Sequence, residues 1–149
     1  MIANRSDGYV LSTDPDRLDV ALVHQWLSTD AFWALGRTRE TVEQSVRGSL
    51  NFAVHDAGGA QVAYARVVTD WATFAWLCDV YVAPAHRGRG LGTWLAEAVR
   101  DHLAPYRLKR LLLATRDAHD VYARAGFTPV RDPGSFMILR PAPEASSGR

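Results

Sequence analysis

The sequence predicts a single mixed α/β domain, and two patterns in the chain support this prediction. Apolar runs of strand length alternate with amphipathic stretches of helical period along the 149 residues. In the middle of the chain, a strand, a glycine-rich loop, a helix and a second strand follow one another. Mixed order of this kind is typical of a sheet covered by helices. We expect one domain over residues 1–140, because this length fits a single core.

The N-terminal half predicts one short strand, two helices and a three-strand meander. The short strand covers residues 9–11. A helix is expected from Asp14-Pro15-Asp16 onward, because an acidic cap and an early proline favour a helix start. A second helix should begin after Thr38 and end at Gly48, since glycine commonly ends helices. The meander comprises the strand-like runs Leu50–His55, Gln61–Thr69 and Phe74–Val82.

The C-terminal half predicts the second part of the sheet. The run 74–82 is apolar apart from Asp79, which is typical of a central strand covered on both faces. Residues 91–103 carry an apolar helical stripe, and Pro105 ends it. A buried strand, a short helix and two closing strands are expected at residues 109–115, 117–125, 127–130 and 136–139. The remaining residues, 141–149, are rich in proline, alanine and serine and are predicted to be disordered.

Charge and cysteine content exclude several classes of protein. Seventeen basic and sixteen acidic side chains leave a net charge of +1, so bulk charge favours neither nucleic acid nor an anionic membrane as a partner. Cys78 is the only cysteine, which rules out an intrachain disulfide and suits a reducing cytoplasm. The N-terminus lacks the apolar core of a signal peptide, and no apolar run is long enough to span a bilayer. We expect a cytoplasmic protein.

The loop at residues 87–92, Arg-Gly-Arg-Gly-Leu-Gly, is suited to binding an anion. Glycines let backbone N–H groups approach a phosphate, and the helix that follows adds free N–H groups. The loop is neither a Walker loop nor a dinucleotide-binding fingerprint, because the lysine and the glycine spacing are absent. Two alternatives stay open, a solvated turn and an RNA-binding Arg-Gly element. The near-neutral charge and the single short copy count against RNA.

Two motifs resemble those of the GNAT acyltransferases. In the stretch 79–92, Arg87, Gly90 and Gly92 match the family pattern Gln/Arg-x-x-Gly-x-Gly/Ala. Downstream, the stretch 118–127 is similar to Ala-x-x-x-Tyr-x-x-x-Gly-Phe. The family often has asparagine three residues before that alanine, where this chain has Thr115. The order of predicted elements agrees with the family over residues 8–140.

The resemblance implies a fold and a cosubstrate. The fold would be a twisted, mostly antiparallel sheet of about six or seven strands, with helices on both faces and a splayed central strand pair. The pantetheine arm of acetyl-CoA would enter the gap between the splayed strands, with its pyrophosphate on the glycine-rich loop. The residues expected to bind it are Val80, Tyr81, Val82, Arg87, Gly88, Arg89, Gly90, Leu91, Gly92, Thr93, Thr115 and Asp117.

The reaction implied by the resemblance is direct acetyl transfer to an amine. Tyr122 aligns with the family's general acid, which would protonate the departing CoA thiolate; its alternative is a core tyrosine. Asp79 is a base candidate, because an unpaired carboxylate in an apolar strand should have a raised pKa. Its alternatives are a structural salt bridge or exposure at a sheet edge. His119 is a second candidate beside Tyr122, or else a surface histidine at a helix start. A water relay could also remove the proton.

Two further chemistries are not expected. Cys78 adjoins Asp79, so alternation along a strand predicts that the two face opposite sides and that the cysteine packs in the core rather than acting as a nucleophile. No cluster of histidine, cysteine and carboxylate has metal-ligand spacing, so no metal is expected.

The acceptor side would lie between the first two helices and the meander. Phe32 and Trp33 could form an aromatic wall, or could equally pack the helix on the sheet. Arg37 and Arg66 would suit a carboxylate-bearing acceptor instead of a plain amine. The acceptor candidates are Asp30, Phe32, Trp33, Arg37, Tyr64, Arg66 and Asp70. The nature of the amine, the existence of a homodimer and a CoA-binding sensor without catalysis all stay open.

Overall fold

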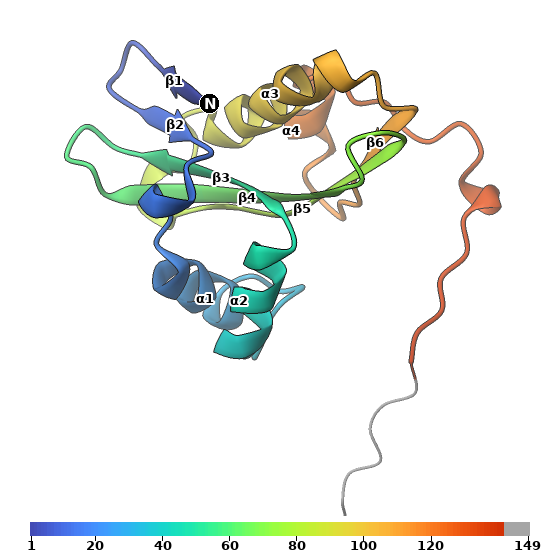
Figure 1. Cartoon of the computed structure of the whole chain (residues 1–149), viewed down its shortest axis with the longest axis horizontal. Helices are drawn as coiled ribbons and strands as arrows, with labels where there is room; N and C mark the ends of the chain where they lie inside the picture. Colours follow the sequence, from blue (N-terminus) through green and yellow to red (C-terminus); the bar gives the residue numbers. More distant parts are fainter. Residues whose placement is uncertain (142–149) are drawn as a thin grey trace, which may run out of the picture.

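A computed structural model describes residues 1–141 and contains one six-stranded sheet (Figure 1). The sheet follows chain order from β1 to β6. Strands β1 to β5 are antiparallel to their neighbours, whereas β6 runs parallel to β5. The predicted mixed α/β class is therefore confirmed. The strands are β1 (Ile2–Asn4), β2 (Val10–Ser12), β3 (Leu50–His55), β4 (Gln61–Thr69), β5 (Phe74–Val82) and β6 (Arg110–Leu112).

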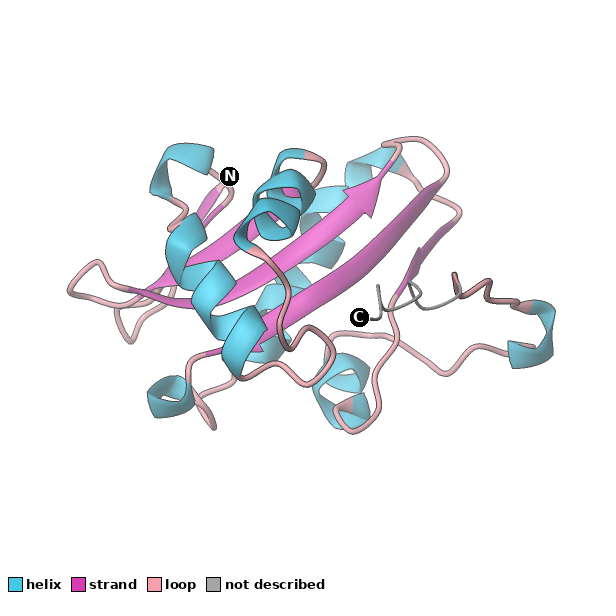
Figure 2. Ribbon diagram, turned by 90° about the horizontal axis from the view of Figure 1, so that it is seen from below, coloured by secondary structure: helices cyan, strands magenta, loops and turns pink. Residues whose placement is uncertain are grey.

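Helices cover both faces of this sheet (Figures 1 and 2). One face carries α1 (Val20–Thr29) and α2 (Arg39–Arg47), and the other carries α3 (Leu91–Leu103) and α4 (His119–Arg124). Thr38 caps α2 and Gly48 ends it, as predicted. The first helix begins later than expected, because Asp14 caps only the short 3-10 turn η1 (Pro15–Arg17) and Asp19 caps α1. Further 3-10 turns are η2 (Pro84–His86), η3 (Ala104–Tyr106) and η4 (Pro133–Ser135).

Apolar side chains fill the space on both sides of the sheet. On the α3 side, Leu95 and Val99 belong to a buried cluster with Phe52 and Leu77 of the sheet. On the α1 side, Val23 packs in a second cluster that includes residues of β4 and β5. Burial on both faces explains why β5 has few polar residues, as expected for a central strand.

A β-bulge in β5 changes the face on which its side chains lie. Opposite β4, the pairing passes from Arg66–Cys78 to Tyr64–Tyr81, so β5 carries one extra residue. Asp79 lies in that extra stretch and has a positive φ of 52°. The bulge turns Asp79 toward the same cavity as Cys78. The predicted opposite orientation of Cys78 and Asp79 is wrong, because period-two alternation breaks at the bulge.

Strands β5 and β6 splay apart, as the predicted fold requires, although β6 is the last strand of the sheet and not a central one. Their parallel pairing ends at Trp76 and Leu112. Beyond that point β5 continues to Val82, while the chain after β6 leaves the sheet and turns toward α4. Within residues 1–141, the C-terminal half of β5 therefore has no sheet partner on this side.

The C-terminal strands are where the sequence prediction fails. Strand β6 is shorter than the expected 109–115, and α4 is shorter than the expected 117–125. Residues 127–130 and 136–139 form no strand. Met137, Ile138 and Leu139 are 97, 75 and 92% exposed, so apolar character did not bring this segment into the sheet. A strand depends on a paired edge as well as on its own residues, and here the chain runs away from β6 (Figure 1).

Strand β1 was not predicted; it pairs with β2 at the outer edge of the sheet. The predicted disordered tail, 141–149, lies outside the described residues apart from its first residue. Among residues 1–141, no helix combines the length and apolar character needed to cross a membrane, and a cytoplasmic location stays a prediction.

Candidate active site

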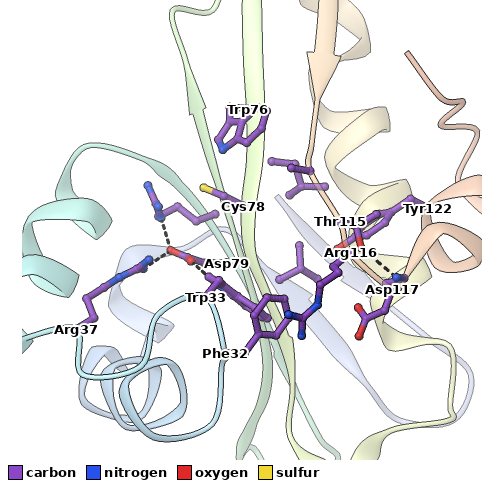
Figure 3. Close-up of a pocket in the computed structure, with 15 residues that line it drawn as sticks. Phe32, Trp33, Arg37, Trp76, Cys78, Asp79, Thr115, Arg116, Asp117 and Tyr122 are labelled. Atoms are coloured by element: carbon purple, nitrogen blue, oxygen red, sulfur yellow. Dashed lines mark hydrogen bonds and ion pairs between the residues drawn. The ribbon is translucent and has the colours of Figure 1, made fainter. Parts of the chain in front are cut away.

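A cavity of about 610 Å³ lies beside the bulge of β5 (Figure 3). Three parts of the chain form its walls, namely the loop between α1 and α2, the strands β4 and β5, and the segment from β6 into α4. The splay of β5 from β6 creates this space, because no strand in the described part of the chain pairs with β5 beyond Trp76 on this side. Its lining residues are Phe32, Trp33, Arg37, Arg66, Trp76, Leu77, Cys78, Asp79, Val80, Ala114, Thr115, Arg116, Asp117, Ala118 and Tyr122.

Asp79 is the centre of a charged cluster on one wall. Its carboxylate accepts hydrogen bonds from Arg37 Nη1 (2.8 Å), Arg66 Nε (2.9 Å) and Trp33 Nε1 (2.9 Å). The Asp79 side chain is only 2% exposed. Burial opposes its ionisation, but the charge of Arg66, the Trp33 hydrogen bond and Arg37 outweigh burial and lower the pKa of Asp79. The raised pKa expected of an unpaired carboxylate is therefore absent, and the geometry is that of the salt-bridge alternative.

Tyr122 lines the opposite wall from α4. Its ring packs edge-on against Phe127, with 6.0 Å between ring centroids. Burial, and to a lesser degree the charge of Asp117, raise the pKa of Tyr122 to about 12. The phenol is therefore protonated at neutral pH, as an ordinary tyrosine also is, and burial makes it a weaker acid.

Thr115 and His119 occupy different positions near Tyr122. Thr115 lines the cavity, and its Oγ1 accepts a hydrogen bond from the Ala118 N–H (3.0 Å) just before α4. This bond fixes the turn that leads into the helix. His119 is exposed at the first position of α4, one turn before Tyr122, and does not line the cavity.

Cys78 lines the cavity beside Asp79. Burial, more than any neighbouring charge, raises the pKa of the Cys78 thiol to about 11. At neutral pH the side chain is a thiol rather than the nucleophilic thiolate. The cysteine is therefore unsuited to covalent catalysis because of its protonation, and not because it points away from the site.

Cys78 gives a direct test of this part of the cavity, since it is the only cysteine. At pH 8 we expect iodoacetamide to alkylate the native protein at least about 10-fold more slowly than the urea-unfolded chain, because a free thiol has a pKa of about 8.5. Intact mass spectrometry against time measures both rates. Equal rates in the two states would contradict the buried, protonated thiol described here.

The glycine-rich loop joins η2 to α3 and is exposed to solvent. Gly88 and Gly90 both have a φ of 76°, a conformation that favours glycine. Gly90 precedes α3 without a side-chain cap, so the first N–H groups of the helix have no capping side chain. The loop therefore offers backbone donors at a helix N-terminus, which is an arrangement suited to a phosphate.

Side chains hold this loop in place. Arg87 donates to the Val82 carbonyl (2.9 Å) and pairs with Asp30 (3.0 Å), so its guanidinium is already partly engaged. Arg5, which the sequence did not single out, donates to the Arg89 carbonyl (2.9 Å) from the β1–β2 connection. Thr93 donates to the Val121 carbonyl (3.1 Å) and ties α3 to α4. Leu91 is buried in the core, so only its backbone can face a ligand.

The predicted acceptor residues divide into two groups. Phe32, Trp33, Arg37 and Arg66 line the cavity. Asp30, Tyr64 and Asp70 do not.

Structural contacts explain why these three lie elsewhere. Asp30 accepts a hydrogen bond from the Tyr81 hydroxyl (2.6 Å) beside the glycine-rich loop, and this bond and Arg87 lower its pKa. Tyr64 is buried and donates to Asn51, which ties β4 to β3. Asp70 closes the β4–β5 turn by accepting hydrogen bonds from residues 72–74.

The sequence missed Arg116 and Trp76, which also line the cavity. The Arg116 guanidinium lies over the Phe32 ring, 3.8 Å from its centroid. No motif marks these residues, because the splay of β5 from β6 decides which side chains face the gap. The sequence predicts a strand over residues 109–115, so Arg116 is expected to follow a fully paired strand and not to face a gap beside β5.

The splayed strands, the exposed loop at the start of α3 and the partly open cavity together fit the acyltransferase class of domain. Residues 20–127 match the model of the Acetyltransferase (GNAT) family. Since the match covers more than half of the chain, the protein belongs to this family, and the resemblance seen in its motifs is confirmed.

Relatives agree with this assignment. A crystal structure of a GNAT-family protein from Xanthomonas campestris pv. campestris is 45% identical, with a TM-score of 0.82 over 94% of this chain and 97% of that one. A Gibberella zeae protein whose name assigns it to the acetyltransferases is 29% identical over 135 residues, 78% of this chain and 76% of that protein. Rv2747 from Mycobacterium tuberculosis, solved with CoA and NLQ, is 22% identical with a TM-score of 0.67 over 80% of this chain and 72% of that one; it shares the fold.

Proposed function

We propose that this protein transfers an acetyl group from acetyl-CoA directly to an amine. The observation that carries the proposal is the gap between β5 and β6, which leads into a cavity where a protonated Tyr122 faces an apolar and charged wall. Family membership supports the reaction class, and the CoA in the solved structure of Rv2747 supports the cosubstrate.

The cosubstrate would bind along the free edge of β5. Val80, Tyr81 and Val82 lie where β5 has lost its β6 partner, so their backbone groups can pair with the amides of the pantetheine arm. The pyrophosphate would rest on the N–H groups of residues 87–93, at the start of α3. Thr115 and Asp117 line the cavity from the other side of the gap.

Tyr122 would act as the general acid. The neutral amine attacks the thioester carbonyl, the carbon–sulfur bond breaks, and the phenol gives its proton to the departing thiolate. Asp79 suits the role of base poorly, because its three hydrogen bonds and lowered pKa favour a permanently ionised carboxylate. We therefore assign proton removal from the amine to a water relay that carries the proton to solvent, from which the Tyr122 phenolate regains its own proton. Asp79 then acts as a positioning residue for Arg37 and Arg66.

A thiol-release assay tests this function. Acetyl-CoA is incubated with the protein and a broad panel of primary amines, and the product is identified by mass spectrometry. We expect CoA release to depend on both protein and amine. The alternative function, a CoA-binding sensor, predicts binding of CoA in a calorimeter without thiol release for any amine.

The glycine-rich loop gives a second test through Gly90→Ala. The positive φ at this position costs a residue with a Cβ about 1 kcal/mol, and the added strain should distort the N–H groups that face the pyrophosphate. We expect the KM for acetyl-CoA to rise about 10-fold, which is about 1.4 kcal/mol.

Gly59→Ala is the matched control for this substitution. Gly59 also has a positive φ, at 86°, and an added Cβ would meet nothing within 4 Å at either position apart from the Arg5 side chain near Gly90. Gly59 lies in the β3–β4 turn, so its variant should lose similar stability and keep the wild-type KM. Equal KM values in the two variants would contradict the placement of the pyrophosphate.

A further inference from the structure

We propose that the acceptor is a small amine that also bears a carboxylate, as an amino acid does, and that Arg37 and Arg66 bind this carboxylate. The inference rests on the proposed acetyl transfer and names the class of acceptor that the same cavity takes. It comes from the charges and unused hydrogen-bond donors on the cavity wall nearest the α1–α2 loop.

The cavity has a surplus of positive charge. Three of its lining side chains are arginines, whereas two are carboxylates. On the cavity wall beside the β5 bulge, Asp79 pairs with both Arg37 and Arg66, and its single negative charge leaves one positive charge unbalanced. A singly charged carboxylate balances that surplus, whereas a doubly charged phosphate would leave an unpaired charge in a half-buried site.

The two arginines have donors to spare. Each guanidinium carries five N–H donors. Among the contacts within residues 1–141, Arg37 uses Nη1 for Asp79, while Arg66 uses Nε for Asp79 and Nη1 for Ser49 Oγ (3.2 Å). The Arg37 and Arg66 side chains are 21% and 15% exposed, and both line the cavity. Because Asp79 fixes them, they meet a carboxylate without losing much side-chain entropy.

The same cluster disfavours a polycationic acceptor. Both carboxylate oxygens of Asp79 already accept hydrogen bonds, so this acid has little capacity to hold an ammonium group. A cation in this position would also face Arg37 and Arg66. The remaining surface beside the cluster is aromatic: the rings of Phe32 and Trp33 meet edge to face, with 5.1 Å between their centroids. This aromatic surface can pack against the apolar part of an acceptor.

The competing explanation is that the cluster only ties the α1–α2 loop to β5. That role predicts no discrimination between acceptors with and without a carboxylate. The twenty standard L-amino acids and their amides separate the two explanations, because an amide removes the negative charge and keeps the shape. Rates are compared per concentration of neutral amine, so that the different basicity of acids and amides does not bias the result.

We expect the best acids to exceed their amides at least about 10-fold in kcat/KM, which corresponds to about 1.4 kcal/mol. Arg37→Gln should raise the KM for the acid at least as much, leave the KM for acetyl-CoA unchanged and bring the acid-to-amide ratio close to one. Arg37→Lys, which keeps the charge, should recover part of the ratio. Arg39→Gln is the control, since Arg39 pairs with Glu43 on the exposed side of α2 and should change nothing.

The outcomes separate failure of the carboxylate assignment from failure of the proposed acetyl transfer. Acetylation of amides or of plain amines such as 2-phenylethylamine at least as fast as the acids would overturn the carboxylate assignment and keep the acetyl transfer. An unchanged acid-to-amide ratio in Arg37→Gln would overturn the role of the arginines. Binding of CoA with no acetylation of any amine would overturn the proposed function itself.

Discussion

Replacing Tyr122 with phenylalanine is expected to lower kcat about 100-fold or more, with little change in the KM for acetyl-CoA. The substitution removes the hydroxyl that we assign to protonation of the CoA thiolate, and it keeps the ring that packs on Phe127. The thiol-release assay with a reacting amine measures both constants. Tyr106→Phe is the control, because Tyr106 is exposed at η3 and away from the cavity. An unchanged kcat in Tyr122→Phe would rule out the general-acid role.

The pH dependence of the acetylation rate tests the same role of Tyr122. Because the pKa of Tyr122 is raised to about 12, its proton is present throughout the working range. The rate should therefore rise with pH as the acceptor amine loses its proton, and Tyr122 should cause no fall below about pH 10, where only a small fraction of the phenol is ionised. In Tyr122→Phe the whole profile should move down without changing shape. A wild-type rate that falls above pH 8 with the protein still folded would contradict this.

Asp79→Ala is expected to cost about 3 kcal/mol of folding free energy, because it leaves two arginines without their shared carboxylate in a mostly buried place. Urea unfolding followed by circular dichroism measures the loss. Glu43→Ala is the control, since its pair with Arg39 is exposed and should contribute less than about 1 kcal/mol. A loss below about 1 kcal/mol for Asp79→Ala would contradict the cluster as described.

The difference in folding free energy between wild-type protein and Asp79→Ala should depend on pH with a definite sign. The folded-state pKa of Asp79 is lowered, so its carboxylate stabilises the protein above the unfolded-state pKa of about 3.9. The stabilisation is lost only as the pH falls from that value through the lower folded-state pKa. Wild-type protein and Asp79→Ala should therefore differ by a constant amount between pH 5 and pH 8, and the difference should shrink only in stronger acid.

The parts of the fold that the sequence predicts well are those with strong local patterns. The meander strands β3, β4 and β5 and the helix α3 have the bounds that their apolar patterns predict. The C-terminal strands fail because their formation depends on a free sheet edge, which residues 127–130 and 136–139 do not encode by themselves.

The candidate site likewise divides into residues that a local sequence motif marks and residues that only the folded structure brings together. Tyr122 follows from a motif, and it does line the cavity. The shared orientation of Cys78 and Asp79 depends on a bulge at a non-glycine residue with positive φ, which no pattern in the strand announces. The stacking of Arg116 on Phe32 joins residues far apart in the chain, and it depends on the splay of two strands.

Direct transfer between two bound substrates is the central claim, and one experiment tests it most directly. The protein is incubated with acetyl-CoA alone, its intact mass is recorded, and a reacting amine is then added while CoA and N-acetylated product are quantified. We predict no acetylated protein in the first step and one N-acetylated product for each CoA released in the second. An acetyl group on the protein that passes to the amine, or CoA binding without release, would contradict the account.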